Sequence, residues 1–203
     1  SSYATGATQN ISSVTQLNIG TGYSGTALNG YLSGLRIIKG SIPTAYQTSS
    51  TTTGTQIFAP PTSPLTAISG TSLLTCQSNN FKDNSVNDFA ITRYGDISVQ
   101  KFSPYEPSPP FSDSTQFAQS SLVGGSTYFD GTGDYLTVPS NAAFTITADF
   151  TVEAWIYPSN VSGTKAIMGI FASGVGGWYF GLKQCLLFQY LRSLYCLLPM
   201  KNR

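Results

Sequence analysis

The most informative segment of the chain spans residues 125–158 and reads GSTYFDGTGDYLTVPSNAAFTITADFTVEAWIYP. Aromatic and β-branched residues recur at every second position on both sides of a turn rich in Gly and Asp, and again in FTVEAWIY. Because neighbouring side chains of a strand point to opposite faces, this period predicts half-buried β-strands. We therefore expect these residues to form opening strands of a β-sandwich.

Strand-forming patterns also occur near the beginning of the chain, in residues 10–14, 16–19 and 31–38. Glycines separate these patterns, which predicts short strands joined by tight turns. Further short strands are expected between residues 65 and 102, at SLLT, FAIT and ISVQ, with Asn, Asp and Gly between them. We expect the strands of this middle region to lie at sheet edges.

Two of these segments together resemble one family. Residues 30–40, GYLSGLRIIKG, resemble the closing strand of the laminin-G-like, concanavalin A-like lectin/glucanase jelly-roll family. The YFDGTGDYL turn and the FTVEAWI strand resemble the start of that family's fold. The resemblance implies an all-β, antiparallel, jelly-roll-like sandwich that is incomplete or permuted, because the closing strand comes first in the chain.

The segment between these two parts is similar to the spacer that joins modules in repeat-containing structural proteins of marine bacterial viruses. We therefore divide the chain into four regions. They are closing strands at 1–46, a spacer with short strands and Pro/Ser/Thr-rich linkers at 47–121, opening strands at 122–183 and an atypical Leu-rich tail at 184–203.

The order of these regions has a physical consequence for pairing. The closing strand at 31–38 and the opening segments at 127–138 are neighbours in the sheet of the family. Each would otherwise expose a long unpaired edge, so the chain is expected to pair them internally.

The tail at 184–203 differs in composition from the rest of the chain, because it is rich in Leu and poor in Ser, Thr and Gly. Its leucines recur at the three- and four-residue spacing of one helical face, which predicts a short amphipathic helix. The alternative is a shifted reading frame. Cys185 and Cys196 lie in or beside this helix pattern and Cys76 lies far from them; free thiols are expected, and a bridge between the first two stays open.

Composition favours a secreted or particle-borne protein over a cytosolic enzyme, and the resemblance implies an extracellular or virion location. Only 9% of the residues are charged and the formal net charge is +1, so the chain offers no large field for nucleic acid or an anionic membrane. No run of about eighteen apolar residues occurs, so membrane insertion is not expected.

The sequence offers little catalytic apparatus. It contains no histidine, which excludes Ser-His and Cys-His pairs and metal sites that need His. Asp149 and Glu153 would lie about 13 Å apart along one strand, whereas the two carboxylates of glycosidases lie about 5–9.5 Å apart. We expect no enzyme activity, and we expect Glu153 to face solvent or to close a polar contact.

Asp130 and Asp134 flank a Gly-Thr-Gly turn and could offer oxygens to calcium. Calcium takes about six to eight oxygen ligands, so other loops would have to contribute. The alternative is a hairpin turn in which Gly131 and Gly133 adopt positive φ and the aspartates accept hydrogen bonds from nearby amides. The oxygen-rich loop around Asp83 is expected to be a turn as well. Calcium is the only cofactor that the sequence leaves open.

Exposed aromatic rings are needed to bind sugars, because a flat ring face packs on a sugar ring. The candidates are Tyr23, Tyr157, Trp178 and Tyr179, with packing in the core as the alternative for each. Trp155 is expected in the core.

The resemblance implies a non-catalytic carbohydrate-binding or adhesion module whose partners are cell-surface glycans or other particle proteins. The alternative is a structural spacer of a virion tail or fibre without a ligand, and a polysaccharide hydrolase is less expected.

Overall fold

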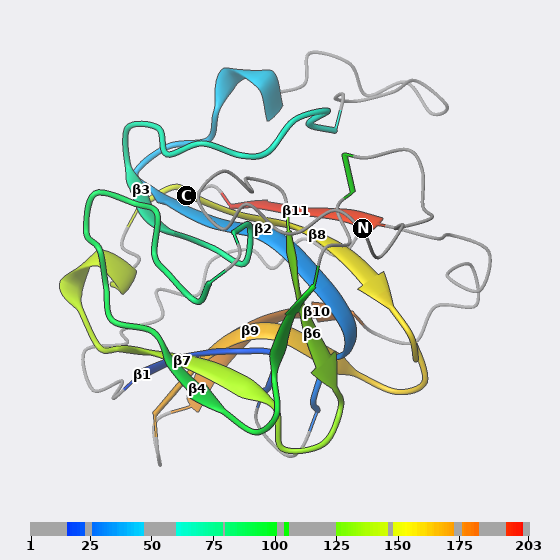
Figure 1. The fold of residues 1–203 in the computed structure, drawn as a ribbon. Coiled ribbons are helices and arrows are strands. Elements are labelled where there is room, and N and C mark those ends of the chain that lie inside the picture. Colours follow the sequence, from blue (N-terminus) through cyan, green and yellow to red (C-terminus); the bar gives the residue numbers. More distant parts are fainter. Residues whose placement is uncertain are drawn as a thin grey trace.

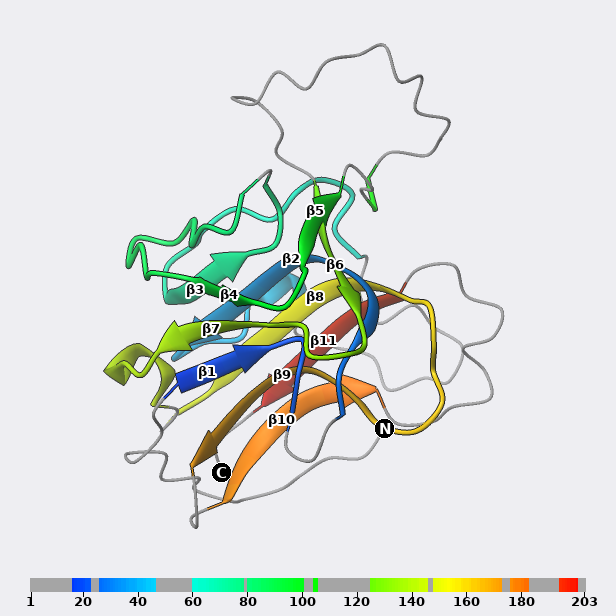
Figure 2. The same cartoon turned by 60° about the horizontal axis from the view of Figure 1, so that its bottom comes forward.

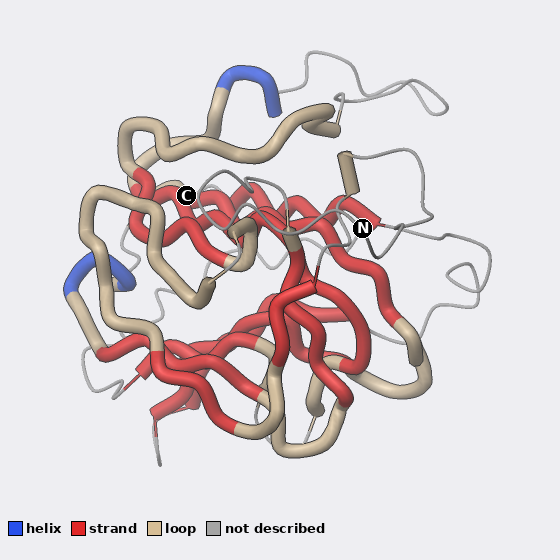
Figure 3. The backbone as a smooth tube through the Cα atoms, viewed as in Figure 1, coloured by secondary structure: helices blue, strands red, loops and turns tan. Residues whose placement is uncertain are grey.

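The computed structural model describes residues 16–22, 26–46, 60–78, 80–100, 104–105, 125–145, 148–172, 176–182 and 194–200. Strands dominate these residues, and two short 3-10 turns, η1 (Thr44–Tyr46) and η2 (Ala142–Phe144), are the helical elements among them (Figure 3). No helix in this described part is long and apolar enough to cross a membrane.

The strands are short and come from all regions of the chain. They are β1 (Gln16–Ile19), β2 (Asn29–Lys39), β3 (Thr71–Thr75), β4 (Thr92–Tyr94), β5 (Ser98–Gln100), β6 (Ser126–Asp130), β7 (Tyr135–Pro139), β8 (Phe150–Pro158), β9 (Lys165–Ala172), β10 (Gly176–Leu182) and β11 (Leu194–Met200).

Within the described residues these strands form two antiparallel sheets that pack face to face (Figure 1). The five-stranded sheet has the order β10-β9-β1-β7-β4, and the six-stranded sheet has the order β11-β8-β2-β6-β5, with β3 also paired to β2. The predicted all-β, antiparallel sandwich is therefore confirmed.

Strands from the beginning of the chain lie in the middle of both sheets. β1 lies between β7 and β9 (Figure 2). β2 pairs with β6, where Tyr31 lies opposite Tyr128, and with β8, where Arg36 lies opposite Glu153. The internal pairing expected from the order of the segments is confirmed, and β1 and β2 contribute side chains to the same core as the later strands.

The strands of the middle region also join these sheets. β4 pairs with β7 and β5 pairs with β6, each at the end of the strand order of its sheet, as expected for edge strands. The strand expected at residues 89–92 is wrong for residues 89–91, because β4 begins only at Thr92. β3 instead pairs with the second half of β2. The described part of the predicted spacer is thus integrated in the sandwich, while its linkers lie largely outside the described residues.

Apolar side chains from both sheets fill the space between them. On β8, Val152, Ala154 and Ile156 face this core and are at most 1% exposed. They meet a set of side chains from the five-stranded sheet that includes Leu17, Ile19, Leu136, Val138 and Met168.

Trp155 lies on the other face of β8, so the expectation that it packs between the sheets is wrong. Its ring is partly buried and meets Tyr105 edge to face, with 6.1 Å between the ring centroids. The period of two shows which residues of a strand share a face, but it does not show which face meets the core. The outer face of this sheet accommodates large side chains because further chain segments cover part of it.

Two covering segments, residues 40–46 and 60–70, lie over the six-stranded sheet on the side away from the five-stranded sheet (Figure 1). They are attached to the sheet by backbone hydrogen bonds. The amide of Gly40 donates to the carbonyl of Asp149 (2.7 Å), and the amide of Lys39 donates to the carbonyl of Gly70 (2.9 Å).

The tail contains a strand where a helix was predicted. β11 pairs antiparallel with β8, with Leu194 opposite Ile156 and Met200 opposite Phe150, so the helix prediction is wrong for these residues. A short apolar run fits a helix and a buried strand equally well by period alone, and the free edge of β8 offers unpaired backbone groups. Pro199 is compatible with this strand because β11 lies at the edge of its sheet.

Candidate functional site

Three tyrosines form a row across the outer face of the six-stranded sheet, which we call the tyrosine face. Tyr31 of β2 lies opposite Tyr128 of β6 on one side and Tyr157 of β8 on the other. The ring centroids are 5.0 Å apart for the first pair and 6.0 Å apart for the second. Each side chain is partly buried. The row exists because three strands from two distant parts of the chain place a tyrosine at the same level.

A small cavity lies beside the tyrosine face. It has a volume of about 10 Å³, which is room for one water-sized group. The residues that line it are Tyr31, Ser33, Pro104, Ser126, Trp155, Ile156 and Tyr157. The cavity therefore joins β2, β6 and β8 at the position of the tyrosine row.

Two serines give this cavity hydrogen-bonding capacity. Ser126 is 1% exposed, and its Oγ has no hydrogen-bond partner among the described residues. The hydroxyl of Ser33 donates to the carbonyl of Gly125 at 2.8 Å. Since buried hydroxyl groups are nearly always hydrogen-bonded, the Ser126 hydroxyl favours an occupant that can donate or accept.

Farther along the same sheet face, a buried ion pair joins β2 to β8. Arg36 Nε donates to Glu153 Oε1 at 2.6 Å, and the Tyr46 hydroxyl donates to Glu153 Oε2 at 2.5 Å. Arg36 Nη1 also donates to the carbonyl of Thr66 at 2.7 Å. The side chains of Arg36 and Glu153 are 6% and 0% exposed. This network fastens both covering segments to the sheet.

Burial is the largest influence on the pKa of Glu153 and of Tyr46 in this network. It raises the pKa of the Glu153 carboxyl, and the hydrogen bond from Tyr46 and the charge of Arg36 offset part of the rise. Burial and the neighbouring Glu153 carboxylate also raise the pKa of Tyr46. Both oxygens of Glu153 are engaged, so of the two roles expected for this residue, the structure shows a closed polar contact.

The loop around Asp130 and Asp134 is a tight turn that is held by hydrogen bonds from backbone amides to the Asp134 carboxylate. Gly131 and Gly133 have φ of +89° and +77°. Asp134 is 1% exposed and accepts hydrogen bonds from the amides of Asp96 (3.0 Å) and Asp130 (2.9 Å). Burial raises the pKa of Asp134, and the nearby Asp130 charge adds to this rise. The hairpin geometry described in the sequence analysis is present.

Asp96 is a third carboxylate in this loop cluster that sequence reasoning missed. Ligand oxygens of Asp96, Asp130 and Asp134 lie within 4.8 Å of one another. Asp96 lies between β4 and β5, far from the other two in the chain, and the pairing of β4 with β7 and of β5 with β6 brings it close. Calcium takes about six to eight oxygen ligands, so backbone carbonyls or waters would have to complete a site here. Both oxygens of Asp134 already accept amide hydrogen bonds, so the structure shows the cluster as a turn, and calcium binding stays a prediction.

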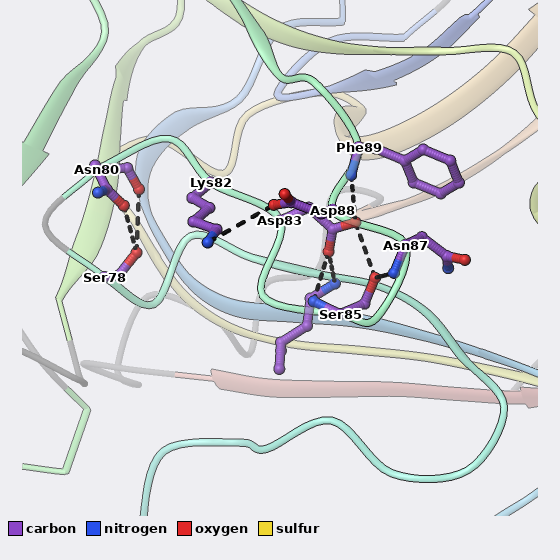
Figure 4. A network of polar contacts seen from close by, with 9 residues as sticks. Ser78, Asn80, Lys82, Asp83, Ser85, Asn87, Asp88 and Phe89 are labelled. Atoms are coloured by element: carbon purple, nitrogen blue, oxygen red, sulfur yellow. Dashed lines mark hydrogen bonds and ion pairs between the residues drawn. The ribbon is translucent and has the colours of Figure 1, made fainter.

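The oxygen-rich loop after β3 is also organised by one buried carboxylate (Figure 4). Asp83, which is 0% exposed, accepts hydrogen bonds from the amide of Ser85 (2.8 Å) and the amide of Phe89 (3.0 Å). It also accepts one from the amide of Leu74 in β3 (3.1 Å). The expected turn is confirmed, and its carboxylate faces inward.

The structure does not gather the four aromatic candidates into one platform. Tyr157 lies on the six-stranded sheet, whereas Tyr179 lies on β10 of the five-stranded sheet and is 47% exposed, which excludes core packing for Tyr179. Trp178 of β10 lies opposite Ile170 of β9, but the side chain of Trp178 is outside the described part. Tyr23 also lies outside the described residues.

Tyr31 and Tyr128 are the site residues that sequence reasoning missed. The signal was present, because one lies in the predicted closing strand and the other in an opening strand that was expected to pair with it. The sequence did not predict the register between these two strands, which places Tyr31 opposite Tyr128. The cysteine expectation is borne out for Cys76, a buried free thiol whose pKa burial raises to about 11, while Cys185 and the side chain of Cys196 lie outside the described part.

A family model for the concanavalin A-like lectin/glucanases superfamily matches residues 130–190. The match begins at the end of β6 and includes β7 to β10, so it supports the resemblance of the opening segment; residues 30–40 lie outside it. Neither curated proteins nor solved structures gave a match. Fold and match together define a concanavalin A-like sandwich and suggest a sugar-binding fold.

Proposed function

We propose that this chain is a non-catalytic carbohydrate-binding or adhesion module. The observation that carries the proposal is the tyrosine face, where the ring of Tyr31 meets those of Tyr128 and Tyr157 at interplanar angles of 47° and 63° on the outer face of the six-stranded sheet. Aromatic rings supply large apolar contact area at fixed geometry, and their hydroxyl groups can bond to sugar hydroxyls.

The absence of a catalytic role is part of the proposal. The chain has no histidine, and Glu153 is held by Arg36 and Tyr46 beneath the covering segments. Incubation with a laminarin-type glucan should release no reducing sugar. Turnover that Glu153→Gln abolishes would show instead that the protein is a hydrolase.

We place the module on an extracellular or virion surface, where weak binding by one site is strengthened when several copies act together. The low charge content and +1 formal charge support a partner recognised by ring packing and hydrogen bonds. Cell-surface glycans have this chemistry. Other particle proteins would be the partners of a spacer without a ligand.

A glycan array tests the proposal. The protein should bind a reproducible set of glycans, and Tyr31→Ala and Tyr157→Ala should each remove most of the signal while thermal unfolding shows that the variants stay folded. Tyr94→Ala is the matched control, because Tyr94 is 43% exposed and stacks on Tyr135 in the other sheet. A blank array would contradict sugar binding and favour the structural spacer.

A further inference from the structure

The cavity beside the tyrosine face has a chemical character that narrows the ligand class. Its lining is made of aromatic, aliphatic and hydroxyl side chains, and none of its lining residues is charged. Tyr31 and Tyr157 border it with their rings, and Ser126 borders it with a buried hydroxyl. This combination of ring faces and a neutral hydrogen-bonding group suits a molecule with apolar C–H faces and hydroxyl groups.

Size determines how much of the ligand enters. A cavity of about 10 Å³ admits one hydroxyl-sized group and excludes a sugar ring. The ring would then lie outside, against the partly exposed rings of Tyr31 and Tyr157. The Ser126 hydroxyl, which has no partner among the described residues, would donate to or accept from the inserted group.

The charged side chains of β2 indicate whether an acidic group could enter the cavity. The two cationic residues of β2 are Arg36 and Lys39. Arg36 is bound to Glu153 in a buried pair, and Lys39 Nζ donates to the carbonyl of Ala142 at 2.8 Å. Neither is placed to meet a carboxylate or sulfate at the cavity, and a buried anion without a cation would be strongly disfavoured.

We propose that the cavity takes one hydroxyl group of an uncharged sugar, with the sugar ring packed on Tyr31 and Tyr157. This inference rests on the proposed carbohydrate binding and specifies its ligand class and its contact atom. In this arrangement Ser126 determines specificity, because its hydroxyl forms a hydrogen bond only with a sugar that carries a hydroxyl group at the inserted position. A carboxylate or sulfate group is excluded from the cavity itself, while an acidic group elsewhere on the sugar would stay in solvent.

The experiment measures binding of neutral glucan, mannan and galactan oligosaccharides, beside uronate and sulfated oligosaccharides, by isothermal titration calorimetry. Neutral sugars should bind, and acidic ones should bind only where they can place a free hydroxyl group in the cavity. Ser126→Ala should weaken binding about five- to tenfold, as expected for one hydrogen bond. It should leave thermal stability unchanged or raise it, because it removes a buried hydroxyl without a described partner.

A second comparison identifies the contact atom. Deoxy analogues of the sugar that binds, each lacking one hydroxyl, are titrated against wild type and Ser126→Ala. One analogue should bind both proteins equally, because the group that Ser126 contacts is already absent. Tyr94→Ala, on the other sheet, is the control and should bind like wild type.

The outcomes separate this inference from the proposed function. Binding that Tyr157→Ala removes but Ser126→Ala leaves unchanged would overturn the hydroxyl subsite and keep sugar binding. Preference for acidic glycans would overturn the neutral class. No binding to any glycan would overturn both.

Discussion

At the scale of single residues, the ion pair between Arg36 and Glu153 is the interaction whose loss should be most costly. Removing one partner leaves the other charge buried and unpaired, which costs about 3–5 kcal/mol. Glu153→Ala should therefore lower the free energy of unfolding by about that amount in a denaturant titration. Glu153 is 0% exposed and also accepts the Tyr46 hydroxyl, so water cannot replace its partners easily.

A matched control for this prediction is the ion pair between Lys82 and Asp88. Its atoms are 3.7 Å apart and its side chains are 55% and 73% exposed. Exposed pairs contribute about 0–1 kcal/mol, so Lys82→Ala should change stability little. Equal losses in Glu153→Ala and Lys82→Ala would contradict the buried network.

Tyr105 should make the fold sensitive to alkali. Burial raises the pKa of its hydroxyl to about 12, against about 10 in the unfolded chain. The unfolded chain therefore releases this proton first, and the stability present below pH 10 is lost as the pH rises toward 12. The pKa of Tyr46 is also raised, so its ionisation should likewise lower the stability of the fold as the pH rises.

The measurement is the free energy of unfolding between pH 9 and pH 11.5 for wild type and Tyr105→Phe. Wild type should lose stability across this range, and the variant should lose less. Identical slopes would show that Tyr105 ionises as freely in the folded protein as in the unfolded one.

Residue-scale features divide into those that the sequence predicts and those that it does not. The turn at Asp130 and Asp134 was predictable because Gly131 and Gly133 are typical of positive φ. The face of β8 on which Trp155 lies was not predictable, because alternation shows which residues share a face but not which face meets the core. The partners of Glu153 were also hidden, because Arg36 and Tyr46 lie far from it in the chain.

At the scale of elements, Gly30 allows β2 to approach β8. Its φ is +141°, and a Cβ at this position would lie 2.3 Å from the backbone carbonyl oxygen of Tyr157. Gly30→Ala should therefore disturb the pairing that holds Tyr31 beside Tyr157. We expect a loss of several kcal/mol in unfolding free energy, since both backbone strain and a clash with rigid backbone contribute.

Gly133→Ala supplies the comparison that isolates the clash. Gly133 also has positive φ, at +77°, but no atom lies within 4 Å of its ideal Cβ. Only conformational strain of about 1–2 kcal/mol should remain there. If both alanine variants lose the same stability, the close approach of β2 to β8 is not present.

Strands with a clear period of two, such as β7 and β8, were predictable as elements. β11 was not, because its leucines fit a helical face and its strand form depends on the free edge of β8. Edge strand β5 was expected, and β4 shares only Thr92 with the strand expected at 89–92. The partners of both strands were not expected, since pairing depends on contacts distant in sequence.

At the scale of the whole molecule, the order of segments in the chain differs from their order in the sheets. β2 lies between β6 and β8, and β1 lies between β7 and β9, so the N-terminal strands close the core formed by the later ones. The resemblance of two segments to the end and the start of one fold made this arrangement predictable. The tyrosine face depends on it, because its three rings come from β2, β6 and β8.

The most direct test of this account is native-state hydrogen exchange of Leu35→Pro, read at the amides of β6, β8 and β9. Leu35 is 0% exposed in central strand β2, where proline removes a backbone donor and a core side chain. If β2 completes the sandwich, protection should fall in all three later strands, well beyond the site of substitution. Unchanged protection of these strands would show that residues 125–182 fold without β2 and would contradict the account.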